Sequence, residues 1–241
     1  MPSDELRNGR PAWLKGLVIG AALIGLSVLM LPIVVVTFST FSLNFTDEWT
    51  MAIGLSVALL PSAALFLSGM WLLSRPTGPG RPDGDLTLRL LALWMVIAAA
   101  GPIIAYYVLR FSGSIATMSV VTGVLAALGG VVAIALFRRL AVLARRAPAP
   151  LLAGDMPWMG WIVASAFAVP LIVTLFHIFP PTIHRHWTVY PWLLAIVFVT
   201  TVWCWSIYLM VRAAIAFRQP LIQAREMWRE GDFRQTAEPQ A

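Results

Sequence analysis

The sequence predicts an all-α, polytopic integral membrane protein with six transmembrane helices. Two observations support this fold class. The first is composition, because 59% of the residues are apolar and only 12% are charged, whereas a soluble domain usually carries about a quarter charged residues. The second is distribution, because the apolar residues occur in six stretches that contain no Asp, Glu, Lys or Arg. Continuous apolar stretches favour helices over the alternating strands of a membrane barrel.

Each of these stretches is long enough to cross a bilayer once. About 20 helical residues, each rising about 1.5 Å, span a hydrocarbon core of roughly 30 Å. The stretches are residues 16–46, 49–74, 90–109, 111–137, 156–184 and 187–211. The first exceeds the apolar core of a secretion signal, so we interpret it as a retained span.

The basic residues predict how the helices are oriented, since Lys and Arg beside a span prefer the cytoplasmic side. All 17 Lys and Arg residues except Arg110 and Arg185 lie in the tails or in the second and fourth connections. We therefore expect an integral membrane protein of the plasma or inner membrane with both termini in the cytoplasm. The net charge of +6 follows this loop pattern, so the expected partners are membrane lipids and not nucleic acid.

The chain divides into three predicted regions. Residues 1–14 form a cytoplasmic tail, and residues 15–215 form the six-helix transmembrane domain. Residues 216–241 form a cytoplasmic amphipathic helix and a polar tail. The helix should begin after Pro220, lie on the membrane surface and end at Gly231.

A proline recurs inside each odd-numbered span. Pro32, Pro102 and Pro170 follow one another at nearly equal intervals, and each precedes two aliphatic residues. The pattern suggests three parallel helical hairpins whose kinked odd helices surround a central path, because proline removes a backbone hydrogen bond and bends a helix. Chance is the alternative, since apolar sequences align easily and proline is frequent in membrane helices.

The histidines are the specific lead to a binding site. All three, His177, His184 and His186, fall in one short segment at the predicted outer end of the fifth span. Neutral imidazole binds zinc or copper, and Asp47 and Glu48 on the first outer connection are suitable additional ligands. The sequence thus suggests a metal at this cluster, or a pigment with one axial histidine. The alternative is a set of interfacial histidines bonded to water and lipid, because their spacing matches no zinc signature.

Small residues predict close helix contacts. Gly16 and Gly20 in the first span have the four-residue spacing that lets two membrane helices approach. Cys204, the one cysteine, lies inside the sixth span and is interpreted as a packing residue.

The functional prediction is a non-catalytic structural or accessory subunit of a membrane complex, with other membrane subunits as partners. No metalloprotease, phosphate-loop, dinucleotide or hydrolase motif occurs, so the sequence does not indicate an enzyme. The spans also lack the charged residues of ion paths. Two alternatives stay open: a transporter or lipid-handling protein for an apolar substrate, and an outer-surface metal- or pigment-binding protein.

Overall fold

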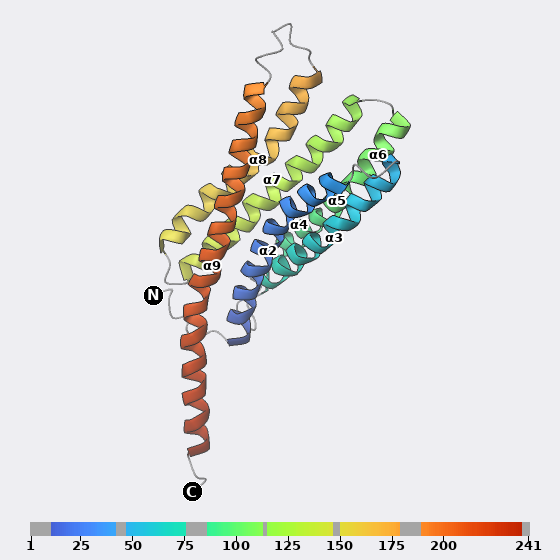
Figure 1. Ribbon diagram of the computed structural model, residues 1–241. Coiled ribbons are helices and arrows are strands. Elements are labelled where there is room, and N and C mark those ends of the chain that lie inside the picture. The colour runs from blue at the N-terminus through green and yellow to red at the C-terminus, as the bar shows by residue number, and fades with distance from the viewer. Residues whose placement is uncertain are drawn as a thin grey trace.

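The computed structural model describes residues 11–41, 47–75, 86–112, 115–146, 150–178 and 189–237. Within these ranges the regular elements are all helices, which confirms the predicted all-α fold (Figure 1). They are α2 (Pro11–Phe41), α3 (Glu48–Leu73), α4 (Leu86–Ala92), α5 (Trp94–Ala99), α6 (Gly101–Ser112), α7 (Ile115–Arg146), α8 (Pro150–Ile178) and α9 (Val189–Ala237).

Among the described helices, five are individually long and apolar enough to cross a membrane, namely α2, α3, α7, α8 and α9. The remaining span is a bent pair in which Leu88–Ala99 and Gly101–Phe111 meet at 57°. The predicted six spans are therefore present when this pair is counted as one. The chain is a multi-pass helical membrane protein.

Gly101 and Pro102 explain the bend in the third span. Pro102 has no N–H for the carbonyl of Ala98, four residues earlier, and its ring crowds that carbonyl. Regular helical bonds flank the break, from Ala100 N to Val96 O at 3.1 Å and from Ile104 N to Ala100 O at 3.0 Å. At Pro32, in contrast, α2 continues without interruption.

The spans form a ring in the order of the sequence. Each span packs on the next one along the chain, and α9 returns to pack on α2 (Figure 1). The most extensive pairings are α7 with α8 and α2 with α3. Only the second of these is a predicted hairpin, so the arrangement as three parallel hairpins stays a prediction.

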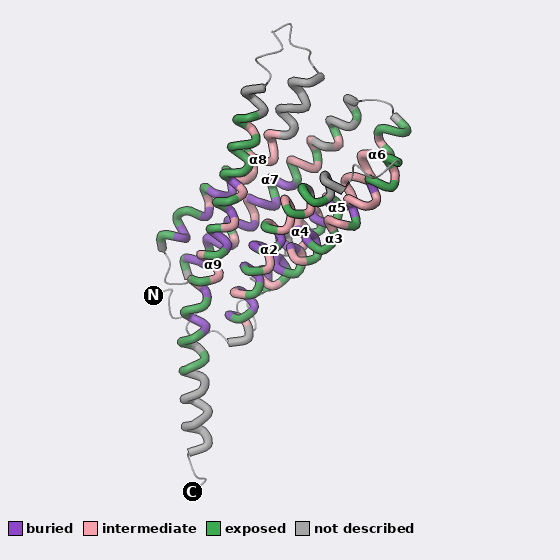
Figure 2. Tube along the Cα trace, in the orientation of Figure 1, coloured by how far each residue is buried: buried purple, intermediate pink, exposed green. Residues whose placement is uncertain are grey.

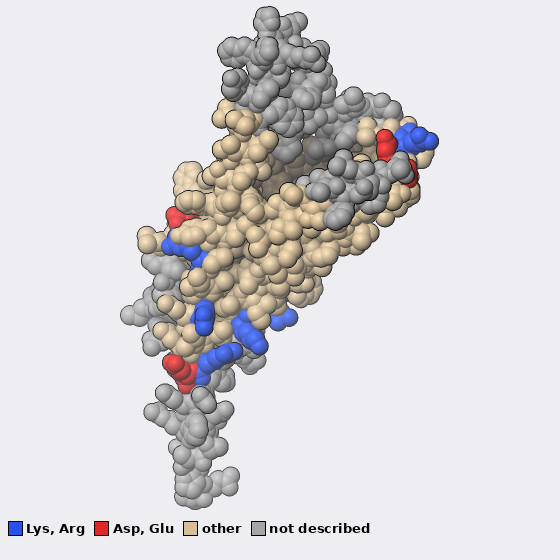
Figure 3. Space-filling view, viewed as in Figure 1, with Lys and Arg blue, Asp and Glu red and all other residues tan. Residues whose placement is uncertain are grey.

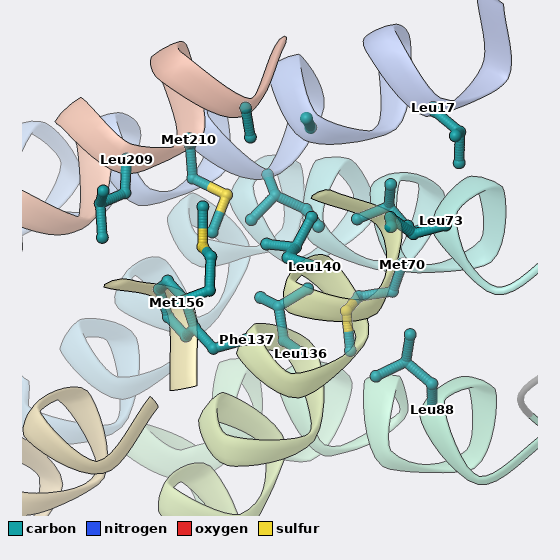
Figure 4. Packing of buried hydrophobic residues seen from close by; sticks show 14 of the residues in the cluster. Leu17, Met70, Leu73, Leu88, Leu136, Phe137, Leu140, Met156, Leu209 and Met210 are labelled. Atoms are coloured by element: carbon teal, nitrogen blue, oxygen red, sulfur yellow. The ribbon is translucent and has the colours of Figure 1, made fainter. Parts of the chain in front are cut away.

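The packed core lies toward one end of the ring. Figure 4 shows several of its large side chains meeting there. The largest fully buried ones are Phe217, Leu14, Leu17, Ile24, Met70, Leu73, Leu88, Leu140, Leu143, Met156 and Leu209. Toward the other end, most described side chains of α9 between Leu193 and Thr201 are exposed (Figure 2). The helices therefore pack tightly at one end and diverge toward the other, which we call the open end.

The tightly packed end is also the basic end. Figure 3 shows Lys and Arg side chains gathered on the lower part of one face. Among the described side chains, those at or beyond this end are Lys15, Arg75, Arg89, Arg138, Arg139, Arg145, Arg212, Arg218 and Arg225, whereas Arg110 lies at the open end. The positive-inside rule predicts that the basic end faces the cytoplasm.

The last helix differs from the sequence prediction of a separate surface helix after Pro220. α9 has 49 residues and continues through both Pro220 and Gly231, and it projects away from the bundle (Figure 1). Pro220 removes one backbone donor, and buried Phe217 and Leu221 on either side hold the helix in place. Good helix formers between Pro220 and Gly231 outweigh the cost of the glycine.

Gly20 and Gly69 allow α2 and α3 to approach closely. A Cβ atom added at Gly69 would lie 2.8 Å from the carbonyl oxygen of Gly20 and 2.6 Å from Cγ1 of Ile24. A Cβ added at Gly20 would lie 3.0 Å from the carbonyl oxygen of Gly69. The predicted close contact is thus confirmed at Gly20. At Gly16 an added Cβ would make only ordinary contact, 3.9 Å from Leu72.

We predict that Gly69→Ala destabilises the protein, because its methyl group meets backbone that cannot move aside. Overpacking of this kind costs about 1–3 kcal/mol. Gly154→Ala is the matched control, since an added Cβ there meets nothing within 4 Å and alanine has the higher helix propensity. Thermal unfolding in detergent should show a lower Tm for Gly69→Ala and an unchanged or higher Tm for Gly154→Ala. Equal Tm values for the two variants would contradict the close approach.

Candidate functional site

A cavity of about 450 Å³ lies at the centre of the ring, near the middle of the spans. Its volume is within the range of about 300–1,000 Å³ that is typical of small-molecule sites. All six spans contribute to its wall, and nearly all of the lining is apolar. Representative lining residues are Leu31 from α2, Phe66 from α3, Met95 from α5, Leu136 from α7, Phe167 from α8 and Trp203 from α9.

The cavity is closed toward the basic end and opens toward the other end. Along α9 the lining side chains Met210, Ser206 and Val202 are 2%, 7% and 6% exposed, whereas Val199, farther out, is 38% exposed. Below the cavity, Leu136, Phe137 and Met210 meet the packed core (Figure 4). The cavity therefore has a floor of large apolar side chains and a mouth among the diverging helices.

Two serines join α2 and α3 beside the cavity. The Ser27 hydroxyl donates to the carbonyl oxygen of Ser62 at 2.8 Å, and the Ser62 hydroxyl donates to the carbonyl oxygen of Ser27 at 3.0 Å. Both serines are buried. Polar groups inside a membrane require internal partners, and this reciprocal pair supplies them.

The other polar side chains of the lining are also bonded within the protein. Ser206 Oγ donates to the carbonyl oxygen of Val202 at 2.7 Å, and Trp94 Nε1 donates to that of Leu125 at 2.8 Å. Trp203 Nε1 donates to the carbonyl oxygen of Val28 at 2.7 Å. The described lining therefore presents hydrocarbon surface to an occupant and leaves no side-chain donor unbonded.

Trp203 replaces a backbone bond that Pro32 removes. In a regular helix the carbonyl of Val28 would accept from the N–H of residue 32, but proline has none. The indole N–H of Trp203 reaches this carbonyl from α9. The Trp203 side chain thereby supplies the donor that the Val28 carbonyl lacks, and it connects the first span to the last.

Gly129 allows two aromatic side chains to form one wall of the cavity. A Cβ added at Gly129 would lie 2.7 Å from Cζ2 of Trp94 and 2.8 Å from Cε1 of Phe167. The two rings pack edge to face, with centroids 5.5 Å apart and planes at 88°, an arrangement that aromatic quadrupoles favour. Sequence analysis missed this wall. Trp94, Gly129 and Phe167 lie in three different spans, and no local sequence pattern connects them.

The predicted histidine site lies outside the described side chains. His177 belongs to α8, but its side chain is not among those described, and His184 and His186 fall outside the described residues. Asp47 caps α3, and its Oδ2 accepts from Thr50 N at 3.3 Å and from Thr50 Oγ1 at 3.2 Å. Among the described side chains, no three His, Cys, Asp or Glu residues group to hold a metal ion. The metal site stays a prediction.

The described lining is apolar, and its polar side chains are bonded within the protein, so the cavity is suited to binding an apolar molecule. Comparisons with protein-family models, with curated proteins and with solved structures find no match to this chain.

We predict that Trp203→Phe, made in the otherwise wild-type protein, lowers the free energy of unfolding by about 1 kcal/mol, because it leaves the Val28 carbonyl without a donor. In a Pro32→Ala background the new N–H of residue 32 can reach that carbonyl, so the same substitution should cost less. Unfolding free energies in a double-mutant cycle measure the difference. Trp205→Phe is the control, because Trp205 is about half exposed. An equal cost of Trp203→Phe in both backgrounds would show that Trp203 does not replace the missing bond.

Proposed function

We propose that this membrane protein is a lipid-handling protein that binds an apolar molecule in its central cavity. The observation that carries the proposal is the cavity of about 450 Å³, which all six spans line and whose polar side chains are already bonded within the protein. Binding sites for small molecules are usually preformed, concave and mostly apolar. A lipid acyl chain, or another molecule rich in hydrocarbon, fits this chemistry.

The difference between the two ends of the ring indicates from which side an apolar ligand enters the cavity. The mouth lies among the diverging helices, and the basic end is closed by large apolar side chains. With the basic end in the cytoplasm of a plasma or inner membrane, an apolar ligand enters from the outer half of the bilayer. A transporter would require a second state in which the closed end opens, and we include transport as the extended form of this proposal.

We predict that filling the cavity prevents ligand binding. Ala98 on α5 and Ala166 on α8 line the cavity, so Ala98→Phe and Ala166→Phe place a ring inside it. Ala127→Phe on α7 is the matched control, since Ala127 is exposed on the outside of the bundle. The probe is a fatty acid with a photoreactive group in its chain, applied to the purified protein with and without excess palmitic acid.

The expected result is labelling of the wild type and of Ala127→Phe that palmitic acid suppresses, and at least about fivefold less labelling of the two cavity variants, which corresponds to about 1 kcal/mol. Thermal unfolding verifies that the variants are folded. Labelling that is equal in all four proteins, or that palmitic acid leaves unchanged, would remove the proposal.

A second candidate is the non-catalytic subunit of a membrane complex. It is favoured by the outer face of α9, where Thr200, Thr201 and Cys204 form an exposed stripe of small residues. Such faces allow membrane helices to approach closely. Purification in mild detergent tests this candidate, and a chain that always migrates alone would count against it. The third candidate, a metal- or pigment-binding protein, rests on His177, His184 and His186 alone.

A further inference from the structure

Arg89 is fixed in one orientation at the basic end of α3. Its Nε donates to Ser74 Oγ at 2.8 Å, and its guanidinium carbon lies 4.3 Å from the centroid of the Trp71 ring. Ser74 is fully buried, and its hydroxyl donates to the Trp71 carbonyl oxygen at 2.9 Å. One nitrogen and one face of the guanidinium are thus occupied, which leaves its terminal amino groups oriented as a fork.

The C-terminal carbonyl groups of α3 do not need Arg89. Arg139 on α7 donates through Nε to the carbonyl oxygen of Leu73 at 3.4 Å and through Nη2 to that of Arg75 at 3.5 Å. Cationic side chains commonly satisfy the last carbonyl groups of a helix in this way. Among the described residues, no acceptor is found for the terminal amino groups of Arg89. The terminal amino groups of Arg89 are therefore oriented to bind an anion.

An exposed apolar path leads from Arg89 toward the middle of the membrane. Leu93 and Ile97 follow Arg89 at four-residue intervals along α4 and α5, and they are 49% and 46% exposed. Trp71, whose ring the Arg89 guanidinium covers, is 50% exposed. Tryptophan prefers the headgroup depth of a bilayer, so the guanidinium fork lies where lipid phosphates lie. Apolar chains can pack below it.

We propose that Arg89, supported by Ser74, Trp71 and Arg75, binds the phosphate of an anionic phospholipid at the basic end, with the acyl chains along Leu93 and Ile97. A guanidinium group binds phosphate through two parallel hydrogen bonds, which gives directional recognition that a surface lysine lacks. Exposed Arg75 adds positive charge. This site is on the outside of the bundle and is independent of the central cavity.

The experiment compares the Tm of the purified full-length chain in detergent with phosphatidylglycerol, with phosphatidylcholine of the same chains, and with inorganic phosphate. The wild type should be stabilised most by phosphatidylglycerol, because ligand that binds the folded state raises Tm. Arg89→Gln should require about tenfold more phosphatidylglycerol for the same shift, since it loses a charge-assisted pair. Arg89→Lys should be intermediate. Arg218→Gln, at an exposed arginine of the same end, should respond like the wild type.

Ser74→Ala adds a test that leaves every charge in place. It removes the acceptor that orients Arg89, so its response to phosphatidylglycerol should weaken while its response to phosphatidylcholine stays that of the wild type. Equal responses of the wild type and all Arg89 and Ser74 variants would overturn the site. A shift that inorganic phosphate produces as well as phosphatidylglycerol does would overturn the lipid as its ligand.

Discussion

Inside a bilayer every backbone carbonyl must find a donor within the protein, and the carbonyl of Val28 shows how this constraint shapes the bundle. Pro32 removes its helical donor, and Trp203 on α9 supplies another at 2.7 Å. The bond joins the first span to the last, so satisfying one carbonyl also closes the ring. The ring in turn encloses the cavity. A proline that removes a hydrogen bond from one helix therefore contributes to the arrangement of all six spans.

The two ends of the ring differ in packing density because different side chains lie there. At the basic end, glycines 20 and 69 bring α2 and α3 together, and large aliphatic side chains fill the centre. At the open end, the bend of 57° turns α6 away from the line of α5, and α9 is exposed on most sides. Packing attraction falls steeply as helices separate. The cavity lies where dense packing gives way to divergence.

Local sequence patterns predicted the helices, but they did not predict the contacts between segments that are distant in the sequence. Hydropathy identified the spans, and Pro102 predicted the bend in the third one, because helix formation depends on neighbouring residues. Pro32, in contrast, does not interrupt α2. Trp203 and Val28 are 175 positions apart, and no periodicity connects them. The predicted start of a new helix at Pro220 was wrong, since buried Phe217 and Leu221 stabilise the helix across the proline. The histidines His177, His184 and His186 stay a prediction, because their side chains lie outside the described part of the chain.

The mouth of the central cavity and the proposed phosphate site lie toward opposite ends of the six-span ring. The basic end combines dense packing with Arg89 and Arg139, whose side chains bond to groups at the end of α3. Local opening requires regions with few buried contacts, and those regions surround the mouth of the cavity. The proposed apolar ligand therefore enters where packing is sparse, and the proposed lipid phosphate on Arg89 would stabilise the densely packed end.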